Sequence, residues 1–433
     1  TSLWFTSVSP ANAGPHCVAR RRPGGRTGRR SNAAPGRGRP RHTLNMFRRV
    51  ASAETAPRQT AAMSASGPHG KLRIPGSGAI KGRGSASWVE GRFERRSAQA
   101  CDDGWDSLRE DDPTFQPAPL RTHVTEETAR SIISRNQSPD VGFSQSVNPY
   151  RGCEHGCVYC FARPSHAYLD LSPGLDFETR LFAKTNAPDR LRAELGKPGY
   201  VCSPIALGIN TDGYQPLERD RGITRACLEI CAQAGQPVHI VTKSALVVRD
   251  LDLLAPMAAR GLVEVHLSVT TLDNRLSARM EPRAAAPHAR LRTIRALAEA
   301  GVPTGVLVAP VIPMISDHEL EAILEATREA GATSAGYVLL RLPHELKEIW
   351  REWLELHYPQ RAAHVMSLVQ QMRGGRDYDS RYGSRMRGQG PFADLIRARF
   401  DRARRALGFG ELPPLRCDLF SPPREVSPQG DLF

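Results

Sequence analysis

The sequence predicts an α/β fold built from parallel βα units. From about residue 120 onward, short runs rich in Val, Ile and Leu alternate with helical segments that end at glycines. Strand followed by helix, repeated along a chain, is typical of a parallel sheet. A loop with three closely spaced cysteines lies at the start of this region, and arginine-rich segments stand near both ends of the chain.

Short apolar runs predict the strands. They lack strict alternation of apolar and polar residues, which is typical of strands buried on both faces. The predicted strands are Gln145–Val147, Ile205–Asn210, Val238–Thr242, Val263–Val269, Thr304–Ala309 and Tyr337–Leu340.

Helices are predicted between these strands. Glycine is common just after the last turn of a helix, and Gly235, Gly261, Gly301 and Gly331 mark such ends here. The predicted helices are Ala187–Leu195, Arg219–Ala234, Asp250–Ala259, Pro287–Ala300 and Asp317–Ala330, with a further one at Phe392–Leu407.

The cysteine loop, residues 153–160, is the strongest sign of chemistry. Cys153, Cys157 and Cys160 are separated by three and then two residues, so one short loop can point three thiolates at a single centre. Thiolates suit an iron–sulfur cluster, and three of them leave one iron of a cubane open. The alternatives are a structural zinc loop, with His155 or His166 as fourth ligand, or ordinary buried thiols.

The net charge of +14 is unevenly distributed along the chain. Residues 1–50 contain eleven arginines and no Lys, Asp or Glu, whereas the remaining 48 basic and 45 acidic residues nearly balance. The high isoelectric point of 9.7 is therefore weak evidence that the folded part binds nucleic acid.

Residues 1–70 are predicted to be a disordered basic tail, because they are rich in Arg, Pro, Gly, Ser and Ala without hydrophobic periodicity. Three interpretations fit this tail: a targeting segment, an arginine-rich nucleic-acid-binding arm, or a start of translation at Met46 or Met63. No apolar stretch approaches the roughly 20 residues that cross a bilayer. The nine irregularly spaced cysteines favour a reducing, cytoplasmic location.

Polar segments follow the predicted strands. Residues 210–216 follow the second strand, 242–244 the third and 268–271 the fourth. In barrel-like folds the chemistry lies at the carboxyl ends of the strands, so these segments are expected to line a site.

The cysteine loop, in which Tyr159 precedes the third cysteine, resembles the cluster loop of the radical S-adenosylmethionine (SAM) superfamily. Together with TDGYQP (211–216), EPRA (281–284) and the glycine- and arginine-rich segment 373–390, it resembles the spore photoproduct lyase-like branch. The similarity runs from about Ile80 to Leu419 and is greatest to bacterial members of unassigned substrate. It implies a partial (β/α)6 radical SAM barrel with a helical C-terminal extension.

The resemblance also implies a domain arrangement. An N-terminal extension (71–140) packs on the core, the barrel spans 141–345, a helical extension with arginines and aromatics spans 346–415, and a flexible tail spans 416–433.

The resemblance implies a lyase-like radical SAM enzyme in which the three loop cysteines bind a [4Fe–4S] cluster and SAM chelates the fourth iron. An external low-potential electron donor is then required. The residues expected to contact SAM are Tyr159, Thr211, Asp212, Lys243, Ser268, Thr270 and Arg283. Spore photoproduct lyases use a cysteine as hydrogen donor, but none of Cys101, Cys202, Cys227, Cys231 and Cys417 can be assigned that role.

A DNA or RNA substrate is suggested by residues 373–405, where ten arginines and four aspartates alternate with aromatics. Arginine beside an aromatic can contact phosphates and stack on bases. A solvated loop and helix, a protein or small-metabolite substrate, and a non-catalytic iron–sulfur or zinc protein are the alternatives. The nucleic-acid candidates are Arg373, Arg376, Arg381, Tyr382, Arg385 and Arg387.

The last five residues, QGDLF, resemble the motif with which bacterial DNA-metabolism proteins dock on the sliding clamp. Gln429, Leu432 and Phe433 would be the anchors of such a tail, which would order on binding.

Overall fold

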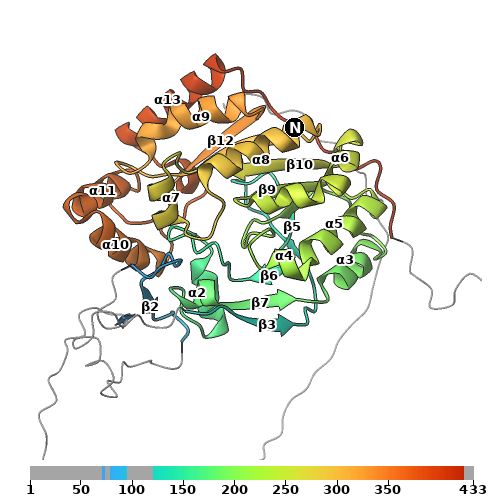
Figure 1. Cartoon of the computed structure of the whole chain (residues 1–433), viewed down its shortest axis with the longest axis horizontal. Helices are drawn as coiled ribbons and strands as arrows, with labels where there is room; N and C mark the ends of the chain where they lie inside the picture. Colours follow the sequence, from blue (N-terminus) through green and yellow to red (C-terminus); the bar gives the residue numbers. More distant parts are fainter. Residues whose placement is uncertain (1–70, 74–78, 95–119, 424–433) are drawn as a thin grey trace, which may run out of the picture. The chain divides into compact units, whose positions relative to one another are not determined.

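A seven-stranded sheet forms the core of the structure, a computed structural model that describes residues 71–73, 79–94 and 120–423 (Figure 1). Its strands lie in the order β12-β11-β10-β9-β8-β5-β4, and all neighbours are parallel except the antiparallel pair β4 and β5. The strands are β4 (Ile133–Arg135), β5 (Gln145–Val147), β8 (Ile205–Leu207), β9 (Val238–Thr242), β10 (Val263–Ser268), β11 (Thr304–Val311) and β12 (Ser334–Leu339). All six predicted strands are therefore confirmed.

The order of the strands makes the sheet a partial barrel. Each parallel strand from β5 to β12 lies beside the one before it in the chain. Because such crossovers are right-handed, their helices fall on the same side of the sheet, and Figure 1 shows them along its outer rim. These helices are α3 (Ala187–Leu195), α5 (Ile223–Ala234), α6 (Leu251–Ala259), α8 (Pro287–Glu299) and α9 (Leu320–Glu329).

Two predicted helices are interrupted at their starts. The helix predicted from residue 219 begins as the short α4 (Glu218–Arg221) and resumes as α5 after Gly222. Gly222 has a φ of +64°, a left-handed conformation that glycine adopts without steric cost. The helix predicted from residue 317 begins with a 3-10 turn, η3 (Asp317–Glu319), before α9.

The strand β10 differs from the sequence expectation because its two faces are chemically distinct. Val263, Val265 and Leu267 belong to the main hydrophobic core, together with residues of α6 and α8. Glu264 and His266 alternate with them and are also buried. Since successive side chains of a strand point to opposite faces, the interior of the partial barrel is polar at this level.

Along the sequence, the cysteine loop lies between two strands of a second, three-stranded sheet. This sheet has the order β3-β7-β6, with β3 (His123–Glu127), β6 (Tyr150–Arg151) and β7 (Arg180–Lys184). Between β6 and β7 the chain also forms a 3-10 helix, η1 (Arg163–Leu169), and α2 (Asp176–Thr179). The strands β1 (Lys71–Arg73) and β2 (Ser87–Val89) form an antiparallel pair near the N-terminus.

The C-terminal region is helical, as predicted. A second hydrophobic cluster joins α10 and α11 to the cysteine loop, because Val158 and Tyr159 pack with Trp350, Leu354 and Val369. Further on, α13 agrees with the predicted helix Phe392–Leu407 to within one residue at each end and packs on α9. The helices of this region and the preceding short helix are α7 (Asn274–Met280), α10 (Leu346–His357), α11 (Pro359–Gln371), α12 (Ser384–Arg387) and α13 (Pro391–Ala406).

Several predictions concern residues at the ends of the chain. The basic tail, residues 1–70, lies outside the described residues, and so do 424–433 with Gln429, Leu432 and Phe433. Residues 416–423 are described, and there the Ser421 N–H donates to the Ala234 carbonyl at 2.8 Å. Within the described residues, no helix has the length and apolar character needed to span a membrane.

Candidate active site at the cysteine loop

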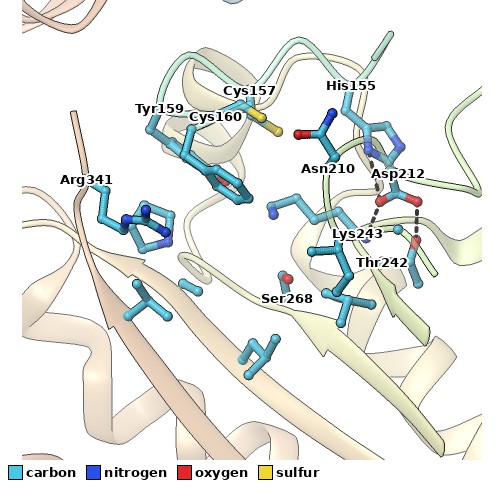
Figure 2. Close-up of a pocket in the computed structure, with 18 of the residues that line it drawn as sticks. His155, Cys157, Tyr159, Cys160, Asn210, Asp212, Thr242, Lys243, Ser268 and Arg341 are labelled. Atoms are coloured by element: carbon cyan, nitrogen blue, oxygen red, sulfur yellow. Dashed lines mark hydrogen bonds and ion pairs between the residues drawn. The ribbon is translucent and has the colours of Figure 1, made fainter. Parts of the chain in front are cut away.

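A cavity of about 1150 Å³, including its mouth, lies at the carboxyl ends of the parallel strands (Figure 2). A hollow lined by apolar side chains and a few polar groups is typical of small-molecule sites. The cysteine loop covers one side of it, and the ends of β8 to β12 form the other. Its polar and sulfur-containing lining residues are Cys153, His155, Cys157, Tyr159, Cys160, Asn210, Asp212, Thr242, Lys243, Ser268, Arg341 and Met386.

All three loop cysteines line this cavity and none forms a disulfide. Cys153 and Cys157 are each 7% exposed. Burial raises the pKa of both thiols well above the ordinary value, and the neighbouring cysteines raise it further. Thiols crowded in this way become thiolates when a metal binds, because a coordinated thiol is deprotonated. The donor set therefore fits a cluster that needs three sulfur ligands.

Arg163 stabilises the backbone of the cysteine loop through hydrogen bonds from its buried guanidinium. Its guanidinium is fully buried and donates to the carbonyls of Cys157 at 2.8 Å and Gly156 at 2.9 Å. It also donates to the Gly174 carbonyl at 2.7 Å and pairs with the Glu178 carboxylate at 2.8 Å. One side chain thus fixes the Gly156 and Cys157 carbonyls, which lie between the first and third cysteines of the loop.

Glu178 connects this support to the N-terminal segment. Its carboxylate accepts the backbone N–H groups of Gly84 and Ser85, each at 2.9 Å. Arg83 donates to the Glu178 carbonyl at 2.8 Å. A Cβ on Gly84 would lie 1.8 Å from the Gly156 carbonyl oxygen, so only glycine allows the N-terminal segment to cross the loop here.

The TDGYQP segment also contacts the cysteine loop. Gln215 is fully buried; its side-chain oxygen accepts the Glu154 N–H at 2.8 Å and its amide group donates to the Gly152 carbonyl at 3.3 Å. The Thr211 hydroxyl donates to the Tyr150 carbonyl at 2.9 Å. The segment therefore positions the loop as well as contributing Asp212 to the cavity.

Asp212 has an organised carboxylate. It accepts the Thr242 hydroxyl and the Lys243 N–H, both at 2.8 Å, and lies 3.3 Å from His155 Nδ1 (Figure 2). Burial by itself raises the pKa of Asp212, but His155 and the hydrogen bonds outweigh it and leave the pKa below its usual value. The carboxylate is therefore ionised in the wall of the cavity at neutral pH.

Lys243 is a cation that faces the cavity. Figure 2 shows its side chain extending from the end of β9 toward Tyr159, and the ammonium lies 5.7 Å from the centre of that ring. Within the described part of the chain, Lys243 forms no ion pair. The Tyr159 hydroxyl donates a hydrogen bond to the Glu281 carboxylate, which in turn pairs with Arg290. These contacts hold the ring in place. An anionic group of a ligand would find an unneutralised ammonium here.

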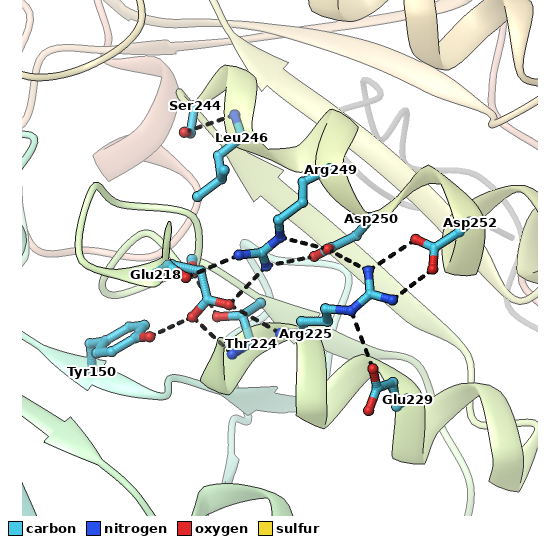
Figure 3. A network of polar contacts seen from close by, with 11 residues as sticks. Tyr150, Glu218, Thr224, Arg225, Glu229, Ser244, Leu246, Arg249, Asp250 and Asp252 are labelled. Atoms are coloured by element: carbon cyan, nitrogen blue, oxygen red, sulfur yellow. Dashed lines mark hydrogen bonds and ion pairs between the residues drawn. The ribbon is translucent and has the colours of Figure 1, made fainter. Parts of the chain in front are cut away.

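A network of polar contacts fixes Tyr150, which lies on β6 just before the cysteine loop (Figure 3). The Tyr150 hydroxyl donates to Glu218, whose carboxylate also accepts the Thr224 N–H at 3.0 Å and pairs with Arg249 at 3.0 Å. Burial raises the pKa of Tyr150 above its ordinary value, and Glu218 raises it further. The phenol therefore stays protonated and keeps donating.

The structure separates the predicted SAM contacts into two groups. Tyr159, Asp212, Lys243 and Ser268 line the cavity. The lining does not include Thr211, Thr270 or Arg283. The Thr270 hydroxyl donates to Glu281 at 2.8 Å, and Arg283 pairs with Glu154 at 2.8 Å. These three side chains therefore support the residues that surround the site.

Five of the polar and sulfur-containing lining residues were not among the predicted contacts: His155, Asn210, Thr242, Arg341 and Met386. Asn210 is the first residue of the polar segment after the second predicted strand, and Arg341 follows the last predicted strand directly. The rule that residues after strand ends line the site therefore contained the signal for both.

The nucleic-acid candidates occupy different environments. Arg373 is buried, donates to the carbonyls of Leu340 and Ser384, and burial lowers its pKa to about 10. Arg381 pairs with Asp379 at 2.9 Å, and Arg385 pairs with Asp140. Arg387 lies over the Tyr337 ring at 4.8 Å. The exposed candidates include Arg376 and Tyr382, the latter 62% exposed.

The histidines of the zinc alternative are engaged elsewhere. His155 lies against Asp212, and His166 Nε2 lies 2.9 Å from the Arg180 carbonyl oxygen. Burial lowers the pKa of His166 to about 4. These contacts favour a site with three sulfur ligands over a four-ligand zinc knuckle.

Comparison with known proteins identifies the family. Residues 147–327 match the model of the radical SAM superfamily. An uncharacterized protein of Mycobacterium tuberculosis is 38% identical over 228 residues, which cover 52% of this chain and 67% of that protein. An uncharacterized protein of Methanocaldococcus jannaschii is 26% identical over 54% of this chain and 82% of its own length.

Among solved structures, spore photoproduct lyase complexed with dinucleoside spore photoproduct is similar, with 15% identity and a TM-score of 0.48. The similarity covers 66% of this chain and 79% of that one. The matched family segment contains the three cysteines and the strands β8 to β11, whose ends line the cavity. The chain therefore belongs to the radical SAM superfamily.

Proposed function

We propose that this chain is an enzyme that binds a [4Fe–4S] cluster and SAM in the cavity and abstracts hydrogen from a nucleic acid. The cluster, when bound and reduced, supplies the electron that splits SAM into methionine and the radical that removes the substrate hydrogen. The remaining work of binding, orientation and exclusion of water belongs to the protein.

The cavity supports this proposal through its donor set. Cys153, Cys157 and Cys160 would hold three irons, which leaves one iron for the amino and carboxylate groups of SAM. Lys243 carries a positive charge that suits the SAM carboxylate, and the ionised Asp212 carries a negative charge that suits the SAM ammonium. Tyr159 places an aromatic ring 5.7 Å from the Lys243 ammonium. The buried wall strengthens each of these charge interactions.

A nucleic-acid substrate is supported by exposed aromatic rings paired with arginines at the border of the cavity. Phe161 lines the cavity while 43% exposed, and the Arg341 guanidinium lies 5.2 Å from its ring centre. Tyr382 is 62% exposed, with Arg385 at 4.6 Å. Exposed aromatics accept stacked bases, and each stacked base contributes about 1–3 kcal/mol.

Tyr382 belongs to a segment that is fastened to the rim of the cavity. Its neighbour Arg385 pairs with Asp140, and the Gly383 N–H donates to the same carboxylate at 2.6 Å. Val141 and Met386, next to these residues in sequence, line the cavity. A base stacked on Tyr382 would therefore leave the adjacent nucleotide close to the cavity mouth.

The test measures binding of fluorescently labelled single-stranded DNA and RNA by anisotropy. Tyr382→Ala and Phe161→Ala are each expected to weaken binding about 5- to 100-fold, as loss of one stacked base predicts. Leu395→Ala is the matched control, since Leu395 is 52% exposed on α13, away from the cavity lining. Equal affinity of all four proteins would exclude these rings from nucleic-acid binding.

The same oligonucleotides distinguish the substrate classes. If nucleic acid is the substrate, it is expected to raise 5′-deoxyadenosine formation above the rate without substrate. Stimulation by a protein or small-metabolite fraction alone would favour those substrates instead. A cluster-loaded protein that never forms 5′-deoxyadenosine would favour a non-catalytic iron–sulfur protein.

A further inference from the structure

Three side chains of types that can bind a metal ion lie together inside the partial barrel, below the cavity. His239 is on β9, and Glu264 and His266 are on β10. The register places His239 directly beside Glu264. Val241 and Ser268, two residues further along the same strands, line the cavity. Two residues of a strand span about 6.6 Å, so this cluster lies one layer beneath the cavity floor.

The ligand atoms of this cluster are close to one another. One ring nitrogen of each histidine and one Glu264 oxygen all lie within 4.8 Å of one another. His239 Nδ1 is 2.5 Å from Glu264 Oε1, and the two imidazole rings are 4.8 Å apart. All three side chains are buried, with at most 4% of each residue exposed.

His266 has an unsatisfied nitrogen in this cluster. Its Nδ1 is buried and has no hydrogen-bond partner within the described part of the chain. Leaving such a buried group unpaired is destabilising.

Glu264 adds a charge that needs compensation. A buried carboxylate is costly unless it is paired or coordinates a metal. His239 Nδ1 contacts one carboxylate oxygen, and a divalent ion between the three side chains would satisfy both the carboxylate and the unsatisfied His266 nitrogen.

We propose that His239, Glu264 and His266 bind a divalent transition-metal ion. Imidazole and carboxylate ligands suit ions such as Zn²⁺, and two histidines with one glutamate form a recurring zinc ligand set. In a tetrahedral site with bonds of about 2.0–2.1 Å, ligand atoms lie about 3.3 Å apart. Side-chain rotations that move the ligand atoms by about an ångström would bring them close to that spacing.

The neighbouring strand leaves room for this cluster. Gly305 on β11 lies beside His266, and a Cβ there would be 2.4 Å from His266 Nε2. A bound ion would join β9 to β10 below Val241 and Ser268 and so stiffen the floor of the cavity. The site differs chemically from the cysteine loop because it contains no sulfur.

The test uses the full chain with Cys153, Cys157 and Cys160 replaced by alanine, so that iron of the cluster loop does not obscure the measurement. After exposure to Zn²⁺ and desalting, inductively coupled plasma mass spectrometry is expected to find about one zinc per chain. Co²⁺ in place of Zn²⁺ is expected to give the visible absorption of a tetrahedral nitrogen and oxygen site. Zn²⁺ is also expected to raise the thermal midpoint of the metal-depleted protein.

Added to this background, His266→Asn is expected to lower zinc affinity by more than about tenfold. His166→Asn is the control, because His166 is another fully buried imidazole outside the cluster. Glu264→Gln, of nearly equal shape, covers the case in which His266→Asn does not fold by circular dichroism. The proposal is overturned if the parent takes up no Zn²⁺, or if uptake persists in the folded His266 or Glu264 variant. A hydrogen-bonded cluster without metal would then explain these residues.

Discussion

Replacing Cys157 by alanine is expected to reduce 5′-deoxyadenosine formation from SAM by more than about a hundredfold. Even the outer hydrogen-bond partners of metal ligands cost about 10- to 100-fold when removed, and Cys157 would be a direct ligand. It is one of three thiols that face the cavity, and the other two cannot hold a cubane cluster by themselves. The measurement is anaerobic reconstitution with iron and sulfide, reduction, and quantification of 5′-deoxyadenosine and of iron per chain.

Cys202→Ala is the matched control. Cys202 is half-buried, its Sγ contacts the Gln236 side-chain oxygen at 3.5 Å, and the cavity lining does not include it. This variant is expected to retain iron and activity. Full activity of Cys157→Ala would contradict the assignment of the cluster to this loop, and equal losses in both variants would indicate a general effect on folding.

Replacing Arg163 by alanine is expected to lower the free energy of unfolding by about 3–5 kcal/mol. The substitution leaves the buried Glu178 carboxylate without its cation and the Gly156 and Cys157 carbonyls without their donor. Breaking one partner of a buried pair is costly because the other charge remains buried. Urea denaturation of the metal-free protein measures the stability, and iron per chain after reconstitution measures the geometry of the loop.

Arg151→Ala tests whether the effect depends on burial. Arg151 also adjoins the cysteine loop and pairs with Glu127 at 2.7 Å, but its side chain is 45% exposed. Exposed pairs contribute about 0–1 kcal/mol, so this variant is expected to unfold nearly as the parent does. Similar stability losses in the two variants would show that Arg163 does not act through its buried contacts.

Most of the main strands could be predicted because they are short apolar runs bounded by turn residues. Val238–Thr242 and Gln145–Val147 agree with β9 and β5 residue for residue. The strands β3 and β7 could not be predicted in the same way, because their sequences, HVTEE and RLFAK, mix charged and apolar residues. Their pairing depends on contacts between distant parts of the chain, which a local pattern does not contain.

The candidate site could be predicted where a residue follows a strand directly. It was harder to predict where a side chain can either face the cavity or hydrogen-bond to a neighbouring residue. Asp212 and Lys243 line the cavity as expected. Thr270 is in an equally suitable sequence position, yet its hydroxyl is bonded to Glu281. Glu264 and His266 alternate with Val263, Val265 and Leu267 in the sequence, but this run was interpreted as a strand buried on both faces, so its polar interior face was not predicted.

Arginines show the limit of composition as a guide. Arg373 and Arg376 look equivalent in a glycine-rich segment, but one is buried against backbone carbonyls and the other is exposed. Only the fold decides which guanidinium a partner can reach, so the number of arginines overstates the charge available to phosphates.

The crossing of Gly84 over Gly156 sets the smallest piece of this chain that can be expected to work. A fragment cut to the matched family segment, residues 147–327, keeps every cysteine of the loop. It loses the two N–H groups that Gly84 and Ser85 donate to Glu178, and the tryptophans of α10 that belong to the same hydrophobic cluster as Tyr159. Fragment design for expression or for grafting this chemistry onto another scaffold must therefore include sequence on both sides of the barrel.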